Sequence, residues 1–382
     1  MAAGLIGISG LSLLIWLVLA FFRGGFWRAD QRLDPAVDLD LEHWPSVVAV
    51  IPARNEAETI GVTVTSLLRQ TYRGQIRVIV VDDNSDDATA KAAGTDKDLH
   101  VIHGAALAEG WTGKLWAVNQ GVQAIDEIAP DADYVLLTDA DIAHDPDNLR
   151  QLVCKAITDN CHLVSLMVAL RCVGFWEKLL IPAFVFFFQK LYPFPLVNNP
   201  AHPMAAAAGG CMLVRLQTLR QTGGIAPIRD RLIDDCALAA QIKRQGPIWL
   251  GLSTQTRSLR AYGKLSEIWL MVARTAFVQL DHSLCNLLGT IVAMVLIYLL
   301  PPVLLVYGLA VHNPLLWLTA GGSCLLMGGL YRPTLMAYQM SLFRALTLPL
   351  AGLMYALMTL SSAARHWRGQ GGAWKGRSYA KK

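Results

Sequence analysis

The 382-residue chain is 54% hydrophobic and only 16% charged, with a mean hydropathy of +0.38. Soluble domains usually carry about a quarter of charged residues, so this composition indicates a membrane protein. No acidic residue follows Asp281, whereas eight of the 33 basic residues do, so carboxylate chemistry must precede that position. The seven cysteines show no Cys-x-x-Cys spacing, which argues against a zinc site or a disulfide framework.

The chain opens with an uncharged run. Residues 4–22 are 19 residues without a charge, which is long enough to cross a bilayer. No small-residue cleavage site follows, so the run is expected to be an anchor and not a signal peptide. Arg23, Arg28 and Arg32 come next, and the positive-inside rule then places the following domain in the cytoplasm. We expect an N-terminal membrane anchor over residues 1–28.

Short β-favouring runs then alternate with helical segments. Strands are expected at residues 47–51, 76–81, 99–102 and 134–137, and helices at 58–70, 114–126 and 146–158. This alternation is typical of right-handed βαβ units and a mostly parallel sheet. We therefore expect an α/β domain over residues 45–281.

Two later segments combine large apolar residues with charged ends. They lie near residues 175–192 and 265–280, and the first contains Pro182. Such segments favour interfacial helices that lie on a membrane, with helices of the protein core as the alternative.

A C-terminal transmembrane region is expected over residues 284–364, ahead of a basic tail at 365–382. Its candidate spans are residues 285–311, 315–331 and 345–363. Three crossings would place the tail outside, against the positive-inside rule. Either one candidate is re-entrant, or the stretch with Pro301 and Pro302 is a hairpin; we expect a cytoplasmic tail.

Two carboxylates, Asp139 and Asp141, directly follow the strand expected at 134–137. In an extended strand, the i, i+2 spacing would place both side chains on one face. Such a pair can hold a divalent cation, which in turn can clamp a diphosphate. The alternative is a helix N-cap by Asp141 or Asp145 without any catalysis.

Polar clusters also follow the first two strands and open the helix near residue 114. Together with the Asp139 cluster they would converge on one rim of a parallel sheet, where nucleotides bind. A carboxylate there can accept a hydrogen bond from a base, Lys114 can offset phosphate charge, and the glycine-rich turn exposes backbone N–H groups to an anion. The candidate donor-binding residues are Pro52, Ala53, Arg54, Glu56, Asp83, Lys114, Asn119 and Asp139.

These motifs resemble the inverting family 2 glycosyltransferases of the GT-A fold over residues 45–280. The resemblance implies that Asp83 contacts the uracil of a nucleotide sugar. It implies a Mg²⁺ or Mn²⁺ site at Asp139 and Asp141, with Asp141 as the direct ligand. The acceptor-side stretch would be Gly209, Gly210 and Cys211, and the catalytic pair Asp234 and Asp235, with Asp235 as general base.

More narrowly, the chain is similar to the bacterial hopene-associated glycosyltransferases. The similarity lies in residues 209–215, 232–238, 257–260, 271–277 and 374–379, and it adds Arg274 to the acceptor side. It implies a multi-pass enzyme of the bacterial inner membrane with a cytoplasmic catalytic domain. Its partners would be a nucleotide sugar, in the first place a UDP sugar, and a hopanoid or other isoprenoid lipid acceptor, with no nucleic acid. A Gln/Arg-x-x-Arg-Trp motif is missing near Gln279, which argues against a processive polymer synthase.

Three other functions account for fewer of these features. A polyprenyl-phosphate sugar synthase would use an anionic phosphate as nucleophile and would need no strong base. A non-catalytic membrane scaffold with this fold would have no reason to keep the acids at all four carboxylate positions. A transport protein is disfavoured because the candidate spans contain no acidic residue.

Overall fold

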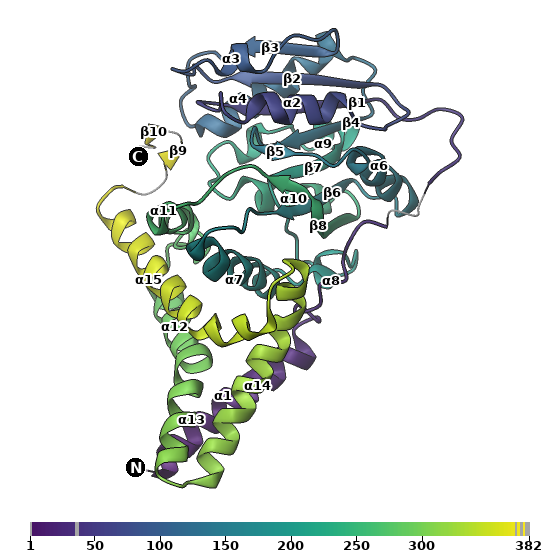
Figure 1. Cartoon of the computed structure of the whole chain (residues 1–382). Coiled ribbons are helices and arrows are strands. Elements are labelled where there is room, and N and C mark those ends of the chain that lie inside the picture. The colour runs from purple at the N-terminus through teal and green to yellow at the C-terminus, as the bar shows by residue number, and fades with distance from the viewer. Residues whose placement is uncertain (1, 35–37, 371–372, 375–376, 379–382) are drawn as a thin grey trace.

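The structure is a computed structural model that describes the chain apart from residues 1, 35–37, 371–372, 375–376 and 379–382. Figure 1 shows three levels: a sheet-containing domain at the top, two helices beneath it, and long apolar helices below. Of the expected basic tail, residues 373–374 and 377–378 form two short antiparallel strands, β9 (Ala373–Trp374) and β10 (Arg377–Ser378). The remaining tail residues after 370 lie outside the described part.

The described residues of the upper domain form an eight-stranded mixed sheet in the order β3-β2-β1-β4-β7-β6-β8-β5. Its strands are β1 (Val47–Ala53), β2 (Ile76–Asp82), β3 (Leu99–His103), β4 (Tyr134–Thr138), β5 (Ile142–Ala143), β6 (Leu163–Ala169), β7 (Cys211–Arg215) and β8 (Ile248–Ser258). Strands β7 and β5 run against the other six. The expected α/β domain with a mostly parallel sheet is thereby confirmed.

Helices cover both faces of the sheet. They are α2 (Ile60–Leu68), α3 (Thr89–Ala92), α4 (Gly113–Gln123), α5 (Ile125–Ile128), α6 (Asn148–Thr158), α8 (Phe194–Val197), α9 (Leu216–Gln221) and α10 (Asp234–Lys243), with a 3₁₀ turn at Ala226–Ile228. Strand β1 shows why its sequence is a continuous apolar run: Val48 and Val50 pack in one core, and Val47, Ala49 and Ile51 in the other. A strand buried on both faces needs apolar residues at every position.

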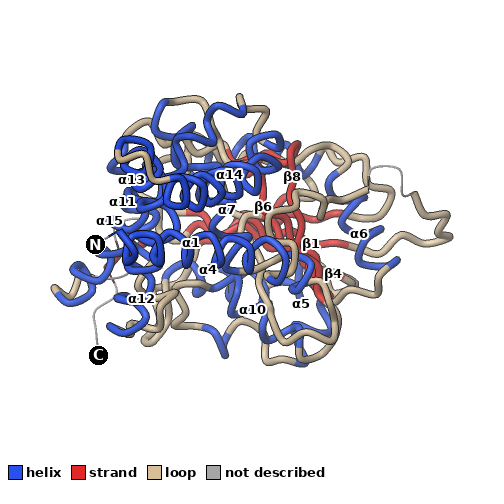
Figure 2. Tube along the Cα trace, turned by 90° about the horizontal axis from the view of Figure 1, so that it is seen from below, coloured by secondary structure: helices blue, strands red, loops and turns tan. Residues whose placement is uncertain are grey.

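Helices α7 (Phe175–Leu191) and α11 (Leu265–Thr275) lie beneath the sheet domain. Figure 2, turned to show this side, places both helices among the apolar ones and in front of the strands. Leu180 and Phe186 of α7 are fully buried in a third core, together with Trp16 and Tyr298 from the long apolar helices. Through this shared core the long helices pack against the helices beneath the sheet domain.

Four helices of the described chain are long and apolar enough to cross a membrane. They are α1 (Ala2–Phe22), a helix over Leu284–Ala310, α14 (Pro314–Ala337) and a helix over Leu342–Trp367. The second consists of α12 (Leu284–Met294), a π-helical turn at Val295–Leu299 and α13 (Leu300–Ala310); the fourth of a 3₁₀ turn at Leu342–Thr347 and α15 (Leu348–Trp367).

The alternative that Pro301 and Pro302 form a hairpin is wrong, since the helix runs unbroken through them. Both prolines lie in the first turn of α13, directly after the π-helical turn. Proline is tolerated in a first turn, and the wider π turn relaxes the hydrogen-bond pattern ahead of it.

Helix α15 lies apart from the bundle of α1, α13 and α14 and runs beside α7, α11 and α12 (Figure 1). The Tyr355 hydroxyl of α15 donates to the carbonyl of Leu180 over 2.9 Å. Ser362 Oγ donates to the carbonyl of Ala273 over 2.6 Å and accepts from the Phe277 N–H over 3.0 Å. Polar contacts of this kind attach α15 to the helices beneath the sheet domain.

Candidate active site

Strand directions explain why distant segments meet at one rim of the sheet. Strands β1, β4 and β8 end at this rim, whereas the reversed strand β7 begins there, with Cys211 opposite Thr138. The segments after β4 and β8 and the glycines before β7 therefore lie together. This is the rim at which open α/β sheets bind ligands.

Asp139 and Asp141 both line a cavity of about 740 Å³ at this rim. The expectation that they share a strand face is wrong, because β4 ends at Thr138 and residues 139–141 form a turn before β5. The N-cap alternative is confirmed in part: Asp145 Oδ1 accepts from the Asp147 N–H over 3.1 Å, a capping contact ahead of α6, in which Asp147 itself makes no side-chain cap bond. Asp141 caps no helix, because it directly precedes β5. The turn at residues 139–141, and not a strand, therefore places the Asp139 and Asp141 carboxylates at the cavity.

Lys114 joins the acids that follow β4 to the later acidic pair. Its Nζ lies 3.0 Å from Asp139 Oδ1 and 3.1 Å from Asp234 Oδ2. Lys114 is placed by the first turn of α4, where Thr112 Oγ1 accepts from the Leu115 N–H over 3.4 Å. Burial opposes the charge of Lys114, but the neighbouring carboxylates outweigh it and raise the lysine pKa. Lys114 is therefore a permanently charged group between two halves of the site.

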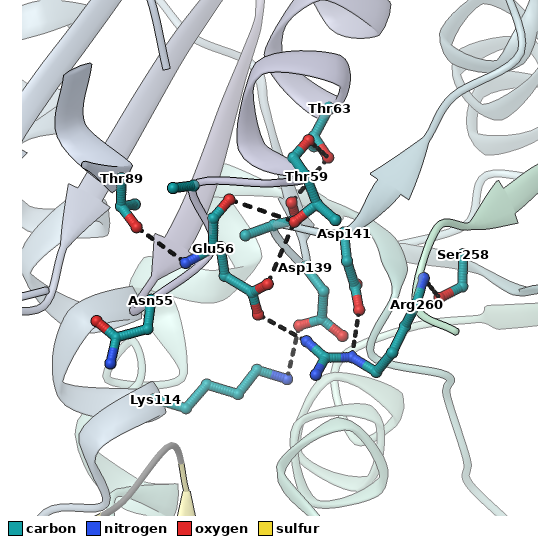
Figure 3. A network of polar contacts seen from close by, with 12 residues as sticks. Asn55, Glu56, Thr59, Thr63, Thr89, Lys114, Asp139, Asp141, Ser258 and Arg260 are labelled. Carbon is teal, nitrogen blue, oxygen red and sulfur yellow. Dashed lines mark hydrogen bonds and ion pairs between the residues drawn. The ribbon is translucent and has the colours of Figure 1, made fainter. Parts of the chain in front are cut away.

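Arg260 makes the corresponding contact with Asp141 (Figure 3). Its Nε donates to Asp141 Oδ2 over 2.7 Å, and its Nη2 donates to Glu56 Oε1 over 2.6 Å. Burial opposes the charge of Arg260, but Asp141 and Glu56 outweigh it and raise the arginine pKa. The sequence reasoning missed this residue. A basic residue shortly after a long β-favouring segment, at 248–258, could have indicated it.

Asp235 stands at the start of α10, close to the glycines before β7. Its Oδ2 accepts from the Gly209 N–H over 3.0 Å, and its Oδ1 accepts from the Cys236 N–H over 2.7 Å. Burial and the neighbouring charge of Asp234 raise the pKa of Asp235 to about 6. A carboxylate with such a pKa is ionised at pH 7 and still basic enough to accept a proton.

The same cavity continues from the carboxylates to apolar side chains of the helices beneath the sheet. Phe184 and Phe188 of α7 and Leu270 and Met271 of α11 line it there. Arg231 and Arg274 also line this cavity. One continuous space therefore has charged groups at the sheet rim and large apolar side chains at α7 and α11, where Glu267 and Arg274 of α11 also line it.

Most of the residues expected at the site line this cavity, and five do not. Those that line it are Pro52, Glu56, Lys114, Asp139, Asp141, Gly209, Gly210, Asp234, Asp235 and Arg274. Ala53, Arg54, Asp83, Asn119 and Cys211 are not among its lining residues. The side chain of Asp83 is fully buried at the end of β2, with Oδ2 4.0 Å from Arg54 Nη1. The contact of Asp83 with uracil stays a prediction.

The residues present fit a hard divalent cation whose ligands come in part from a substrate. Asp139 and Asp141 supply the carboxylate oxygens that Mg²⁺ and Mn²⁺ prefer. Among the residues that the structure describes, those of this site included, there is no group of three or more His, Cys, Asp or Glu side chains that could hold a metal ion by itself. Magnesium is commonly held by one or two carboxylates together with substrate phosphates and water, which matches this pair.

Comparison with known proteins agrees with this geometry. Residues 48–223 match the family model described as Glycosyl transferase family 2. No curated protein matches the chain.

Among solved structures, this chain is similar to a mannosyltransferase from Pyrobaculum calidifontis in complex with GDP-Man and Mn²⁺. The alignment covers 91% of this chain and 99% of the mannosyltransferase, at 19% sequence identity and a TM-score of 0.50. A mannosyl-3-phosphoglycerate synthase from Rubrobacter xylanophilus covers 62% of this chain and 74% of its own, at 18% identity and a TM-score of 0.41. A glucosyl-3-phosphoglycerate synthase from Mycobacterium tuberculosis, in complex with Mn²⁺, UDP and its product, covers 62% and 80%, at 20% identity and a TM-score of 0.39. At 19% identity, the likeness to the Pyrobaculum mannosyltransferase concerns the fold alone.

Proposed function

We propose that this chain, whose residues 48–223 match the family model of Glycosyl transferase family 2, is a membrane-bound enzyme that transfers a sugar from a nucleotide-diphosphate sugar to a hydroxyl group of a lipid. The observation that carries the proposal is the single cavity that joins the carboxylates at the sheet rim to the apolar side chains of α7 and α11. Such a space suits a reaction between a polar donor and an apolar acceptor. The donor is in the first place a UDP sugar.

The donor half is the group around Asp139, Asp141 and Lys114. Its two carboxylates would hold Mg²⁺ or Mn²⁺, which neutralises the charge that grows on the departing diphosphate. Lys114 lies 3.0 Å from Asp139, so its positive charge is available on the same side of the cavity. Pro52 and Glu56, at the end of β1, line this part of the cavity and bound the space for the donor.

The acceptor half is built around Asp235. The acceptor oxygen attacks the anomeric carbon from the face opposite the diphosphate, the bond to the diphosphate oxygen breaks, and the hydroxyl proton passes to the carboxylate of Asp235. Attack from the opposite face inverts the anomeric centre. The N–H groups of Gly209 and Cys236 fix both oxygens of Asp235, which limits its motion before the proton is transferred.

The membrane arrangement follows from the placement of the long helices. We propose that α1, the helix over Leu284–Ala310 and α14 cross the membrane, and that α15 does not. The contacts of α15 with α7 and α11 support this assignment. With only two crossings after the catalytic domain, the domain and the tail lie on the same side, the cytoplasm, where Arg23, Arg28 and Arg32 also lie.

The similarity to hopene-associated glycosyltransferases supports a hopanoid or another isoprenoid lipid as the acceptor and a bacterial inner membrane as the location. A second candidate is supported by Arg231 and Arg274, whose cationic side chains line the acceptor part of the cavity. Arginine binds phosphate well, which favours a polyprenyl phosphate as the acceptor. There the nucleophile is already anionic, and Asp235 would matter little.

The experiment is transfer by the purified full chain, in lipid bilayers, from UDP sugars to extracted lipids, with the product identified by mass spectrometry. We expect a glycolipid in which the sugar is attached to a lipid hydroxyl, and UDP release that depends on the lipid. A glycosylated lipid phosphate would instead establish the second candidate. No nucleotide release with any donor would favour the scaffold. Lipid profiles of a deletion strain and its parent would show the acceptor in the cell.

A further inference from the structure

Arg260 is the feature that the proposed donor site does not yet explain. Its guanidinium bonds to Glu56, after β1, and to Asp141, after β4. The family match ends at residue 223, so it says nothing of Arg260. In Figure 3 the arginine side chain points from the end of β8 towards both acids.

The backbone holds Arg260 at this place. The N–H of Leu259 donates to the carbonyl of Asp141 over 2.7 Å, and the N–H of Arg260 donates to Ser258 Oγ over 3.3 Å. Strand pairing of Ile142 with Ser258 continues the connection. The segment that carries Arg260 is therefore attached directly to the turn that carries Asp141, and the ion pair is part of the rim.

In this ion pair, Arg260 occupies the Asp141 carboxylate to which a divalent cation would have to bind. Arg260 is paired with Asp141, and Lys114 with Asp139, so each acid of the pair already has a cationic partner. The side chains of Asp141 and Glu56 are 9% and 13% exposed. Hydrogen bonds between charged groups are stronger at such partly buried sites than at the surface, so a free metal ion would have to displace a favourable contact.

A donor changes this balance because its diphosphate is a good partner for a displaced guanidinium. Arginine recognises phosphate oxygens in a bidentate manner. Metal binding that costs an ion pair in the free enzyme becomes favourable once both the metal and Arg260 can bind the diphosphate. Two ligands that favour the same arrangement bind cooperatively, and each raises the affinity of the other by the same factor.

We propose that Arg260 occupies the cation position beside Asp141 in the donor-free enzyme and moves onto the donor diphosphate when a divalent cation binds Asp141. The protein then binds its metal together with the nucleotide and only weakly without it. This inference rests on the proposed function for the identity of the donor, but not on the acceptor.

The test measures Mn²⁺ binding to the purified full chain in detergent by electron paramagnetic resonance, with and without UDP. Wild type should bind Mn²⁺ weakly alone and much more tightly with UDP. Arg260→Gln should bind Mn²⁺ without UDP about tenfold or more tighter than wild type, since a charge-assisted hydrogen bond is lost as competitor. The UDP-induced gain should shrink in this variant, and Arg260→Lys should lie between the two.

Arg257→Gln is the matched control, since Arg257 is exposed near the end of β8, three positions before Arg260, and does not line the cavity. The double variant Arg260→Gln with Asp141→Asn should lose the tighter Mn²⁺ binding. Equal Mn²⁺ affinity of wild type and a folded Arg260→Gln protein, as judged by thermal melting, would overturn the inference; Arg260→Lys provides the same comparison if Arg260→Gln does not fold. Failure of wild type to bind UDP with Mn²⁺ would instead overturn the proposed donor.

Discussion

The proton-accepting role proposed for Asp235 leads to a quantitative pH prediction. Burial and the charge of Asp234 raise the pKa of the Asp235 carboxyl to about 6, and the ionised form would be the active base. About nine tenths of the enzyme then carries ionised Asp235 at pH 7 and about one tenth at pH 5, so kcat/KM should fall roughly tenfold between these values. Activity is lost as the pH falls through the pKa, because protonation removes the base.

Replacement of the carboxylate provides the complementary measurement. General-base assistance is worth about 10²–10⁴-fold, so Asp235→Asn should lose transfer by roughly two orders of magnitude or more. The affinity for UDP should stay close to that of wild type, since Asp235 contacts the Gly209 and Cys236 backbone and no donor-side acid. Asp234→Asn should be milder than Asp235→Asn.

The assay is the initial rate of UDP release with lipid acceptor present, measured from pH 5 to pH 8 for each variant. Asp230→Asn is the control for the change in charge, since Asp230 is exposed in the loop ahead of α10 and does not line the cavity. For Asp235→Asn, the plot of rate against pH should show no change in slope near pH 6. A variant with near-normal rate, or with the pH dependence of wild type, would refute the reasoning and favour an anionic phosphate acceptor.

Three further predictions concern the metal, the membrane and the core. EDTA should abolish transfer and Mn²⁺ or Mg²⁺ should restore it, whereas Asp141→Asn should stay inactive yet folded; full turnover in EDTA would contradict the metal site. Reporters fused after Asp281 and after Lys382 should both report the cytoplasm, and a periplasmic signal from the second would mean that α15 crosses the membrane. Gly121→Ala should lower stability by about 1–3 kcal/mol in thermal melts, because a Cβ would lie 2.5 Å from a Val50 methyl carbon, whereas Gly263→Ala has no atom within 4 Å and should be neutral.

The sequence allowed the parallel part of the sheet to be predicted because its strands are local signals. Strands β1, β2 and β4 are largely apolar runs that end in polar clusters, β3 is a short β-favouring run, and each of the four lies within a residue or two of its expected bounds. The strands from β5 onwards were not predicted. Their place in the sheet depends on pairing with partners far along the chain, such as β6 with β8, and no local pattern encodes that pairing.

The acids of the candidate site were accessible to sequence reasoning, whereas their cationic partners were accessible only in part. Asp139 and Asp141 stand in a short motif whose place at the rim was expected from strand direction, whereas the place of Asp235 was expected only from the family resemblance. The bond from Arg260 to Asp141 spans 119 positions and depends on the order of β8 and β5 at the sheet edge. The position of α15 likewise depends on hydrogen bonds to α7 and α11, since its composition alone is that of a span.

The division of the site between matched and unmatched segments has a chemical meaning. Lys114, Asp139 and Asp141, the residues proposed for the donor, lie within residues 48–223, which match the family. Asp235, Arg260 and Leu270 follow that segment and yet line the same cavity. Nucleotide diphosphates are alike from one donor to another, so the groups that bind them can be shared. Acceptors differ, and the groups that face them must differ too. Under the proposed function, the identity of the acceptor should therefore depend on α10, on α11 and on the long apolar helices packed against α11, and exchange of these elements between related enzymes should change the acceptor and leave the donor unchanged.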